Sequence, residues 1–101
     1  MPKINHVVLF GWTDSATATQ CAACVEALHA LPGLVPGLLT CTGGPQISPE
    51  PPGQGLDYGV VMTFADEAAR DLYLTHPEHL RVIRDHIAPI LGRVQVLDYA
   101  L

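Results

Sequence analysis

Residues 3–11 constrain the fold most, because this segment reads as a β-strand that is apolar on both faces. Alternate side chains of a strand point to opposite sides of its sheet. One face receives Ile4, His6, Val8 and Phe10, and the other receives Asn5, Val7, Leu9 and Gly11. A strand with two largely apolar faces is typical of a sheet that is covered on both sides. Any fold for this chain must therefore supply two covers for one sheet.

The order of the remaining patterns indicates the fold class. After the first strand come a helix, two strands, a helix in two parts and a last strand. We expect these elements at 16–31, 38–42, 58–64, 67–74, 78–90 and 93–99, with Asp14 or Ser15 as the N-cap of the first helix and Asp66 before the second. The order β-α-β-β-α-(α)-β is the ferredoxin-like, split βαβ arrangement. It predicts one α+β domain over residues 1–101, with a four-stranded antiparallel sheet and helices on one face.

Residues 43–55 separate the two middle strands and hold four prolines and four glycines. This composition predicts a loop. Its length suits either a plain solvent-exposed connection or a lid over a site.

The second face of the sheet needs a cover that the helices do not supply. Of the 101 residues, 49% are hydrophobic, while a domain of this size buries only about 60–70% of the surface of its unfolded chain. Surplus apolar residues are typical of an interface, and symmetric homodimers are the commonest oligomers. We therefore expect a homodimer in which two open sheet faces pack against each other, forming a dimeric α+β barrel.

The charge pattern excludes several classes of partner. The formal net charge is −5 with only five basic residues, and these are scattered along the chain, whereas nucleic-acid binding needs clustered Lys and Arg. No apolar run approaches the roughly 20 residues of a membrane span, and the first residues lack a signal-peptide pattern. We expect a cytoplasmic protein without nucleic-acid or membrane partners.

The three cysteines favour packing over metal binding or redox chemistry. Their odd number is unlike a disulfide framework. Cys21 and Cys24 have CxxC spacing, yet they lie inside the expected first helix rather than at its start, and no second pair of ligands has matching spacing. His79 and His86 are seven residues apart, about two helical turns, which is too far for one ion. We expect no metal and no cofactor.

Candidate chemistry concentrates in the segment from Tyr73 to His79, which places a phenol and two imidazoles around the start of the third helical segment. A histidine with an ordinary pKa of about 6.5 can take and return a proton near neutrality, so His79 is the candidate base. Tyr73 is the candidate hydrogen-bond donor to an oxyanion, and Asp98 is a candidate to orient the imidazole. The alternative is a purely structural role, in which His76 caps backbone N–H groups and Pro77 sets the first turn.

The first and third strands add candidate binding residues. His6, Val8 and Phe10 share one face of the first strand, and Tyr58 opens the third. With Asp98, these residues are the candidates for lining a substrate pocket between the sheet and the helices. The alternatives are a hydrogen-bonded core histidine at His6, a buried aromatic with a partnered hydroxyl at Tyr58, and a place in the dimer interface for Asp98.

Several segments together resemble the stress-responsive A/B barrel family, also called Dabb, of the dimeric α+β barrel superfamily. They are spread over almost the whole chain and comprise His6–Phe10, Leu34–Leu38, Tyr58–Phe64, Tyr73 with His76–His79, and Val96–Tyr99. The resemblance implies a ferredoxin-like protomer and a homodimer whose two sheets form a barrel. It implies less about activity, because most family members have no assigned reaction.

One plant member of the family, olivetolic acid cyclase, closes a linear polyketide by aldol condensation, and this chain resembles it distantly. By position, its catalytic histidine falls on His79 and its catalytic tyrosine on Tyr73. Its two pocket histidines fall on His6 and Tyr58. The aromatic residues that wall its pocket are replaced here by smaller side chains, those of Cys24, Val25 and Leu28. The resemblance therefore implies a differently shaped pocket.

Three functions are open at this point. The first is a homodimer of unassigned function that binds a small hydrophobic or aromatic molecule in a pocket between the sheet and the helices. The second is a polyketide-cyclase-like aldol catalyst with His79 as base and Tyr73 as oxyanion donor. The third is a non-catalytic structural oligomer of the stress response. A monooxygenase of the related barrel superfamily is a more distant alternative.

Overall fold

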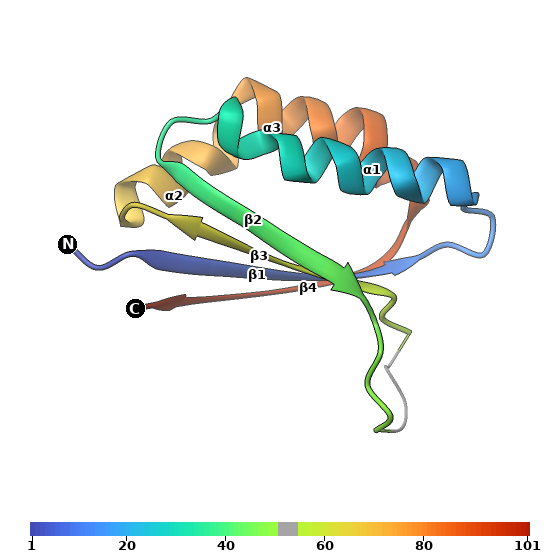
Figure 1. The fold of residues 1–101 in the computed structure, drawn as a ribbon. Helices are drawn as coiled ribbons and strands as arrows, with labels where there is room; N and C mark the ends of the chain where they lie inside the picture. The colour runs from blue at the N-terminus through green and yellow to red at the C-terminus, as the bar shows by residue number, and fades with distance from the viewer. Residues whose placement is uncertain (51–54) are drawn as a thin grey trace.

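The computed structural model describes residues 1–50 and 55–101. Four antiparallel strands form one sheet in the order β2-β3-β1-β4, and the helices lie on one face of it (Figure 1). The elements in chain order are β1 (Ile4–Trp12), α1 (Ala18–Ala30), β2 (Leu38–Pro45), β3 (Tyr58–Phe64), α2 (Glu67–Thr75), α3 (Pro77–Val82) and β4 (Leu91–Ala100). Turns of 3-10 helix occur at Leu31–Gly33 and Ala88–Ile90, and a π-helical turn occurs at Ile83–Ile87. This arrangement confirms the expected ferredoxin-like α+β fold.

The first helix begins later than expected, because Thr17 rather than Asp14 or Ser15 is its N-cap. The Thr17 Oγ1 accepts a hydrogen bond from the Gln20 amide at 3.1 Å, and the Thr17 amide donates one to Gln20 Oε1 at 2.9 Å. This reciprocal capping box satisfies two backbone N–H groups at once, which outweighs the intrinsic capping preference of the earlier residues.

The Asp66 cap of α2 is confirmed. The Asp66 carboxylate accepts a hydrogen bond from the Ala69 amide at 2.8 Å. This contact satisfies one of the free N–H groups at the start of the helix and places a negative charge there.

Strand pairing extends two elements beyond their expected ends. β2 runs to Pro45 because it pairs with β3 as far as Tyr58, so the expected loop at 43–55 begins only after Pro45. β4 begins at Leu91 because it pairs with β1 as far as Trp12. The hypothesis that this loop forms a lid over a site concerns residues 51–54 in part, and these lie outside the described residues.

The expected helix at 78–90 is not one uniform helix. It is α-helical only to Val82 and then continues as the π turn and a 3-10 turn. The π turn inserts one extra residue per turn relative to an α-helix. This insertion lies beside the sheet face on which the site is built.

The core lies between the helical layer and the sheet face that it covers. Phe64, Leu28 and Tyr73 are almost fully buried there. Cys24 is fully buried as well, and burial raises the pKa of its thiol to about 11. A thiol that stays protonated is a poor nucleophile, so the packing role expected for the CxxC pair holds for Cys24.

The opposite face of the sheet carries no helix from the described part of the chain (Figure 1). The register places Val7 and Leu9 of β1 and Leu97 and Tyr99 of β4 on it. Leu97 is 61% exposed and Tyr99 is 46% exposed. We call this surface the open sheet face. It is the uncovered apolar side that the pattern of residues 3–11 predicts.

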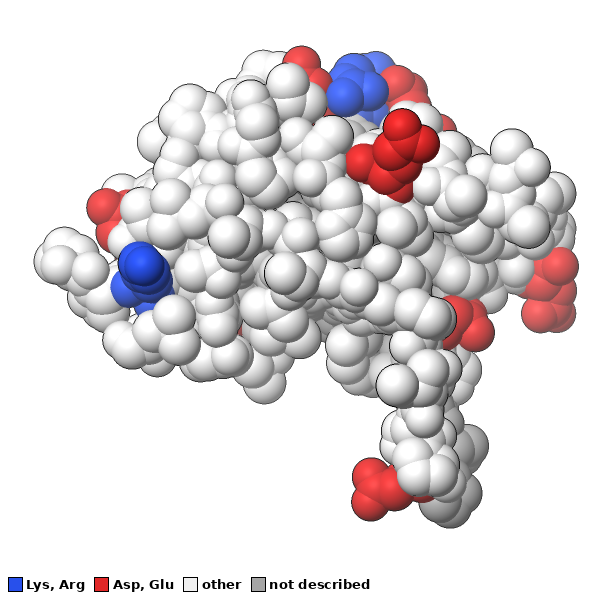
Figure 2. All heavy atoms as spheres, viewed as in Figure 1, with Lys and Arg blue, Asp and Glu red and all other residues white. Residues whose placement is uncertain are grey.

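Charged side chains are sparse on the face of the molecule seen in Figure 2, where Lys and Arg lie at two separate places. This face therefore lacks the clustered positive charge that nucleic-acid binding requires. Among the described helices, none combines the length and the apolar character that a membrane crossing demands.

Candidate functional site

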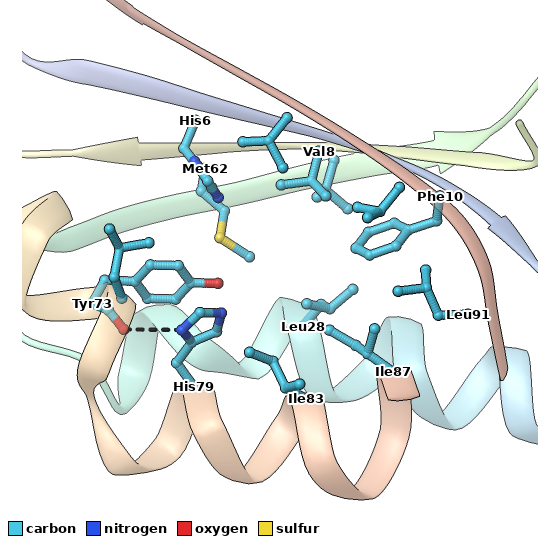
Figure 3. A pocket seen from close by; sticks show the side chains of 14 residues that line it. His6, Val8, Phe10, Leu28, Met62, Tyr73, His79, Ile83, Ile87 and Leu91 are labelled. Atoms are coloured by element: carbon cyan, nitrogen blue, oxygen red, sulfur yellow. Dashed lines mark hydrogen bonds between the residues drawn. The ribbon is translucent and has the colours of Figure 1, made fainter. Parts of the chain in front are cut away.

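A cavity of about 320 Å³ lies between the helical layer and the sheet face that it covers (Figure 3). Its walls are apolar except for three residues, His6, Tyr73 and His79. The other lining residues are aliphatic, aromatic or methionine side chains, among them Val8, Phe10, Leu28, Met62, Ile83 and Ile87. A mostly apolar cavity of this size with a few polar groups is typical of a site for a small organic molecule.

Tyr73 and His79 come together because two short helices meet at a break. His76 ends α2 and caps α3, since its Nδ1 accepts a hydrogen bond from the Glu78 amide at 3.1 Å, and Pro77 occupies the first turn of α3. The structural role weighed for His76 and Pro77 is confirmed. The same break allows the rings of Tyr73 and His79 to stack with their centroids 3.9 Å apart.

His79 leaves one ring nitrogen for the cavity. Its Nδ1 donates to the backbone oxygen of Tyr73 at 3.0 Å (Figure 3). Because a carbonyl oxygen can only accept, Nδ1 carries the hydrogen and Nε2 keeps its lone pair. Burial lowers the pKa of His79 below its ordinary value of 6.5, and backbone hydrogen bonds to Leu74 and Tyr73 offset this only in part. The ring is therefore a neutral imidazole at neutral pH, with Nε2 as a proton or hydrogen-bond acceptor.

The Tyr73 hydroxyl points into the same cavity (Figure 3). The residue is 2% exposed, and burial raises the pKa of its phenol. The hydroxyl thus stays protonated and available as a donor. In the described part of the chain, neither this hydroxyl nor Nε2 of His79 has a hydrogen-bond partner. The cavity therefore offers one free donor and one free acceptor side by side.

His6 is the third polar residue of the cavity, and Asp98 holds its ring. The His6 Nδ1 donates to one carboxylate oxygen of Asp98 at 2.6 Å, and Arg70 donates to the other at 2.5 Å. The His6 ring meets Tyr73 edge-on, with centroids 5.8 Å apart. Asp98 does not orient His79, contrary to the expectation from sequence, because the residue opposite Asp98 in the β1–β4 register is His6.

The structure places most of the predicted site residues around one cavity. His6, Val8, Phe10, Tyr73 and His79 line it, and Asp98 stands behind His6. Tyr58 does not line the cavity. It starts β3 opposite Phe10, where its ring packs beside Trp12 and its hydroxyl donates to His29 Nε2 at 3.3 Å. The alternative of an aromatic with a partnered hydroxyl therefore describes Tyr58.

Some residues that line the cavity were not predicted from the sequence. Val94 and Val96 lie on the helix-facing side of β4, and Ile83 and Ile87 come from the π turn. Alternate residues of β4 point to the same face of the sheet, so this period of two could have indicated that the two valines face the helices. No local sequence pattern marks the π turn. Arg70 was missed because its contact with Asp98 joins α2 to β4.

A metal site finds no support in the described residues. No three or more of their His, Cys, Asp and Glu side chains come together in a way that suits a metal ion. The polar groups of the cavity are two imidazoles and a phenol. These groups suit hydrogen bonding and proton transfer.

The comparisons with known proteins agree with the fold. The family model described as Stress responsive A/B Barrel Domain matches residues 4–101. A stress-response A/B barrel domain-containing protein of Arabidopsis thaliana is 29% identical over 100 residues, which cover 95% of this chain and 36% of the plant protein. The chain therefore spans only about a third of the length of that curated relative.

Solved structures extend the comparison. A dimeric ferredoxin-like protein of unknown function from Thermobifida fusca is 29% identical with a TM-score of 0.82, and the match covers 99% of this chain and 92% of that one. The hydroxynitrile lyase of Passiflora edulis has a TM-score of 0.89 at 18% identity, and the match covers 99% of this chain and 94% of the lyase. At that identity the likeness to the lyase concerns the fold alone.

Proposed function

Because the chain belongs to the stress-responsive A/B barrel family, we propose that it acts as a homodimer whose protomers each bind a small, neutral hydrophobic or aromatic molecule in the cavity. The observation that carries the proposal is a free hydrogen-bond donor on Tyr73 next to a free acceptor on His79, both inside an apolar cavity. A ligand group that accepts from the phenol and donates to the imidazole satisfies both. A hydroxyl group on a hydrophobic molecule has that chemistry.

The homodimer is supported by the open sheet face. Its apolar side chains include Val7 and Leu9 as well as the exposed Leu97. A second copy packed face to face would remove this surface from water. The Thermobifida fusca relative is described as dimeric, which agrees with such an assembly.

We place this single domain of residues 1–101 in a reducing compartment, the cytoplasm. Cys21, Cys24 and Cys41 are all free thiols, and the first and last of them are partly exposed. Free thiols of this kind persist where disulfides are kept reduced.

Binding can be tested with three related probes: 1-naphthol, naphthalene and 1-naphthoate. We expect 1-naphthol to raise the melting temperature most, because only its hydroxyl both donates and accepts, and a bound molecule stabilises the native state. Tyr73→Phe should weaken 1-naphthol binding about five- to tenfold, the effect of one hydrogen bond, and leave naphthalene binding unchanged. Isothermal titration at fixed pH measures both affinities.

The matched control is Tyr58→Phe, which removes a phenol hydroxyl outside the cavity lining. It should leave 1-naphthol binding unchanged. Equal losses in the two variants, or the absence of any melting shift with 1-naphthol, would remove the cavity from the proposal.

Proton-transfer catalysis in the same cavity is a second candidate. The observation that favours it is the neutral His79, held by its Nδ1 with Nε2 free, stacked on a phenol that stays protonated. In an aldol-type reaction, Nε2 would take a proton from the carbon next to a ligand carbonyl. The Tyr73 hydroxyl would donate a hydrogen bond to the enolate oxygen that forms.

Exchange of the methyl hydrogens of acetophenone for deuterium is the simplest form of that step. We expect the protein to accelerate the exchange and His79→Gln to abolish the acceleration, while His29→Gln, at an exposed histidine outside the cavity, retains it. Proton NMR in D₂O follows the reaction. If the protein binds ligands but does not accelerate exchange, the binding function is supported. If it does neither, the structural oligomer is the function that is left for this chain.

A further inference from the structure

A hydrogen-bonded chain of three residues leads from the outer surface to the cavity. Arg70 on α2 donates to Asp98 on β4, and Asp98 accepts from His6 on β1. The side chains of Arg70 and Asp98 are partly exposed, at 19% and 24%, whereas that of His6 is 8% exposed. The chain thus joins three elements and ends at a ring that lines the cavity.

The contact with Asp98 determines which nitrogen of His6 carries a hydrogen. A carboxylate can only accept, so Nδ1 of His6 is the donor in the 2.6 Å contact. In the neutral ring the second nitrogen, Nε2, then has a lone pair. With Nε2 of His79 this gives the cavity two acceptors and, at Tyr73, one donor.

The groups around His6 show how Asp98 is held against the ring. Asp98 from β4 faces the ring with a negative charge, and Arg70 from α2 faces Asp98 with a positive one. Tyr73 of α2 lies against the ring as a neutral phenol, and His79 of α3 interacts with it electrostatically. From β3, the residue paired with His6 is Met62, which has no charge. Arg70 also pairs with Asp71 at 2.9 Å and with Glu67 at 3.8 Å on its own helix. Its contact with Asp98 therefore serves to hold that carboxylate against His6.

We propose that Asp98 and Arg70 are positioning residues for the cavity: Asp98 fixes the His6 tautomer that carries its hydrogen on Nδ1, and Arg70 holds the Asp98 carboxylate in place. The consequence for binding rests on the proposed function. Two imidazole acceptors favour ligands that carry hydroxyl donors and disfavour carboxylates, whose oxygens only accept. The state of His6 itself does not depend on any ligand.

The ring nitrogens of ¹⁵N-labelled histidines report this state directly in long-range ¹H–¹⁵N spectra, with the His6 signals assigned by their loss in His6→Gln. In the neutral ring of the wild type, we expect the hydrogen on Nδ1 and the lone pair on Nε2. Asp98→Asn should mix the two tautomers, because an amide can accept or donate. Arg70→Met should let the Asp98 carboxylate move and so raise the share of the other tautomer, by less than Asp98→Asn does.

Two variants control for charge and for folding. Arg84→Met removes a positive charge from an exposed pair with Asp85 and should leave His6 unchanged. Arg70→Lys keeps a donor to Asp98 and should restore most of the wild-type tautomer ratio. If Arg70→Met does not fold, as judged by its backbone amide spectrum, Arg70→Lys against wild type carries the comparison, with a smaller shift in the same direction.

The ligand arm uses 1-naphthol and compares Asp98→Asn with Arg84→Met at one pH. We expect about twofold weaker binding by Asp98→Asn, because a ring divided between two tautomers offers the Nε2 lone pair about half as often. A wild-type His6 with its hydrogen on Nε2, or identical tautomer ratios in wild type, Arg70→Met and Asp98→Asn, would overturn the positioning role. Failure of the wild type to bind 1-naphthol would count against the proposed function only, because the ring-nitrogen spectra decide the positioning role without it.

Discussion

Leu97→Glu is expected to convert the homodimer into monomers. Leu97 is 61% exposed in the protomer and lies on the open sheet face opposite Val7 of β1. In a face-to-face dimer the new carboxylate would be buried against apolar side chains without a partner, and the desolvation of such a charge costs several kcal/mol. Light scattering after size exclusion should show the mass fall from twice 10.8 kDa to 10.8 kDa.

Leu72→Glu is the matched control for this prediction. Leu72 is 65% exposed, a fraction close to that of Leu97, but it lies on α2 in the helical layer. The control should therefore keep the mass of the wild type. A dimer that survives Leu97→Glu and dissociates with Leu72→Glu would place the interface on the helices instead.

The largest expected loss of stability follows Phe64→Ala. Phe64 has no exposed surface, and its ring packs 5.1 Å from that of Tyr73 and 6.2 Å from that of His6, measured between centroids. Removing a buried phenyl ring leaves a cavity and loses its burial, which lowers the free energy of unfolding by about 3–5 kcal/mol. Urea unfolding measures this at one fixed protein concentration, since dimerisation is linked to stability.

Ile47→Ala provides the reference for an apolar truncation without burial. Ile47 is 89% exposed, so its loss should change the free energy of unfolding by no more than about 0.5 kcal/mol. A Phe64→Ala variant as stable as Ile47→Ala would mean that the layer between sheet and helices is not the core of the protein.

Local patterns predicted the parts of the fold that local interactions determine. The strand at 58–64 and the Asp66 cap follow from period-two alternation and from one side chain next to its own helix. The capping box at Thr17 was equally local and was overlooked, because Asp14 and Ser15 precede it with side chains of similar capping preference. The ends of β2 and β4 depend on pairing with strands distant in the sequence, so no local pattern fixes them.

The site residues, too, could be predicted only where local patterns bring them together. His6, Val8 and Phe10 could be grouped from their shared strand face, and Tyr73 with His79 from a short segment around a proline. The partner of Asp98 could not be predicted, because it depends on the register between the first and last strands. Tyr58 was assigned to the pocket because it opens the third strand and matches a pocket histidine of the family by position. Its hydroxyl is instead engaged by His29.

The two edges of the sheet differ in a way that matters when a protomer is alone. β2 ends in Gly43, Gly44 and Pro45, a sequence that resists further strand addition. β4 forms the other edge, and its stretch 94–97 is uncharged and exposed. Such an edge can template amyloid-like growth by recruiting identical strands from other molecules. Arg93 and Asp98 flank this stretch, and charged residues beside an apolar strand disfavour such growth while a protomer is alone.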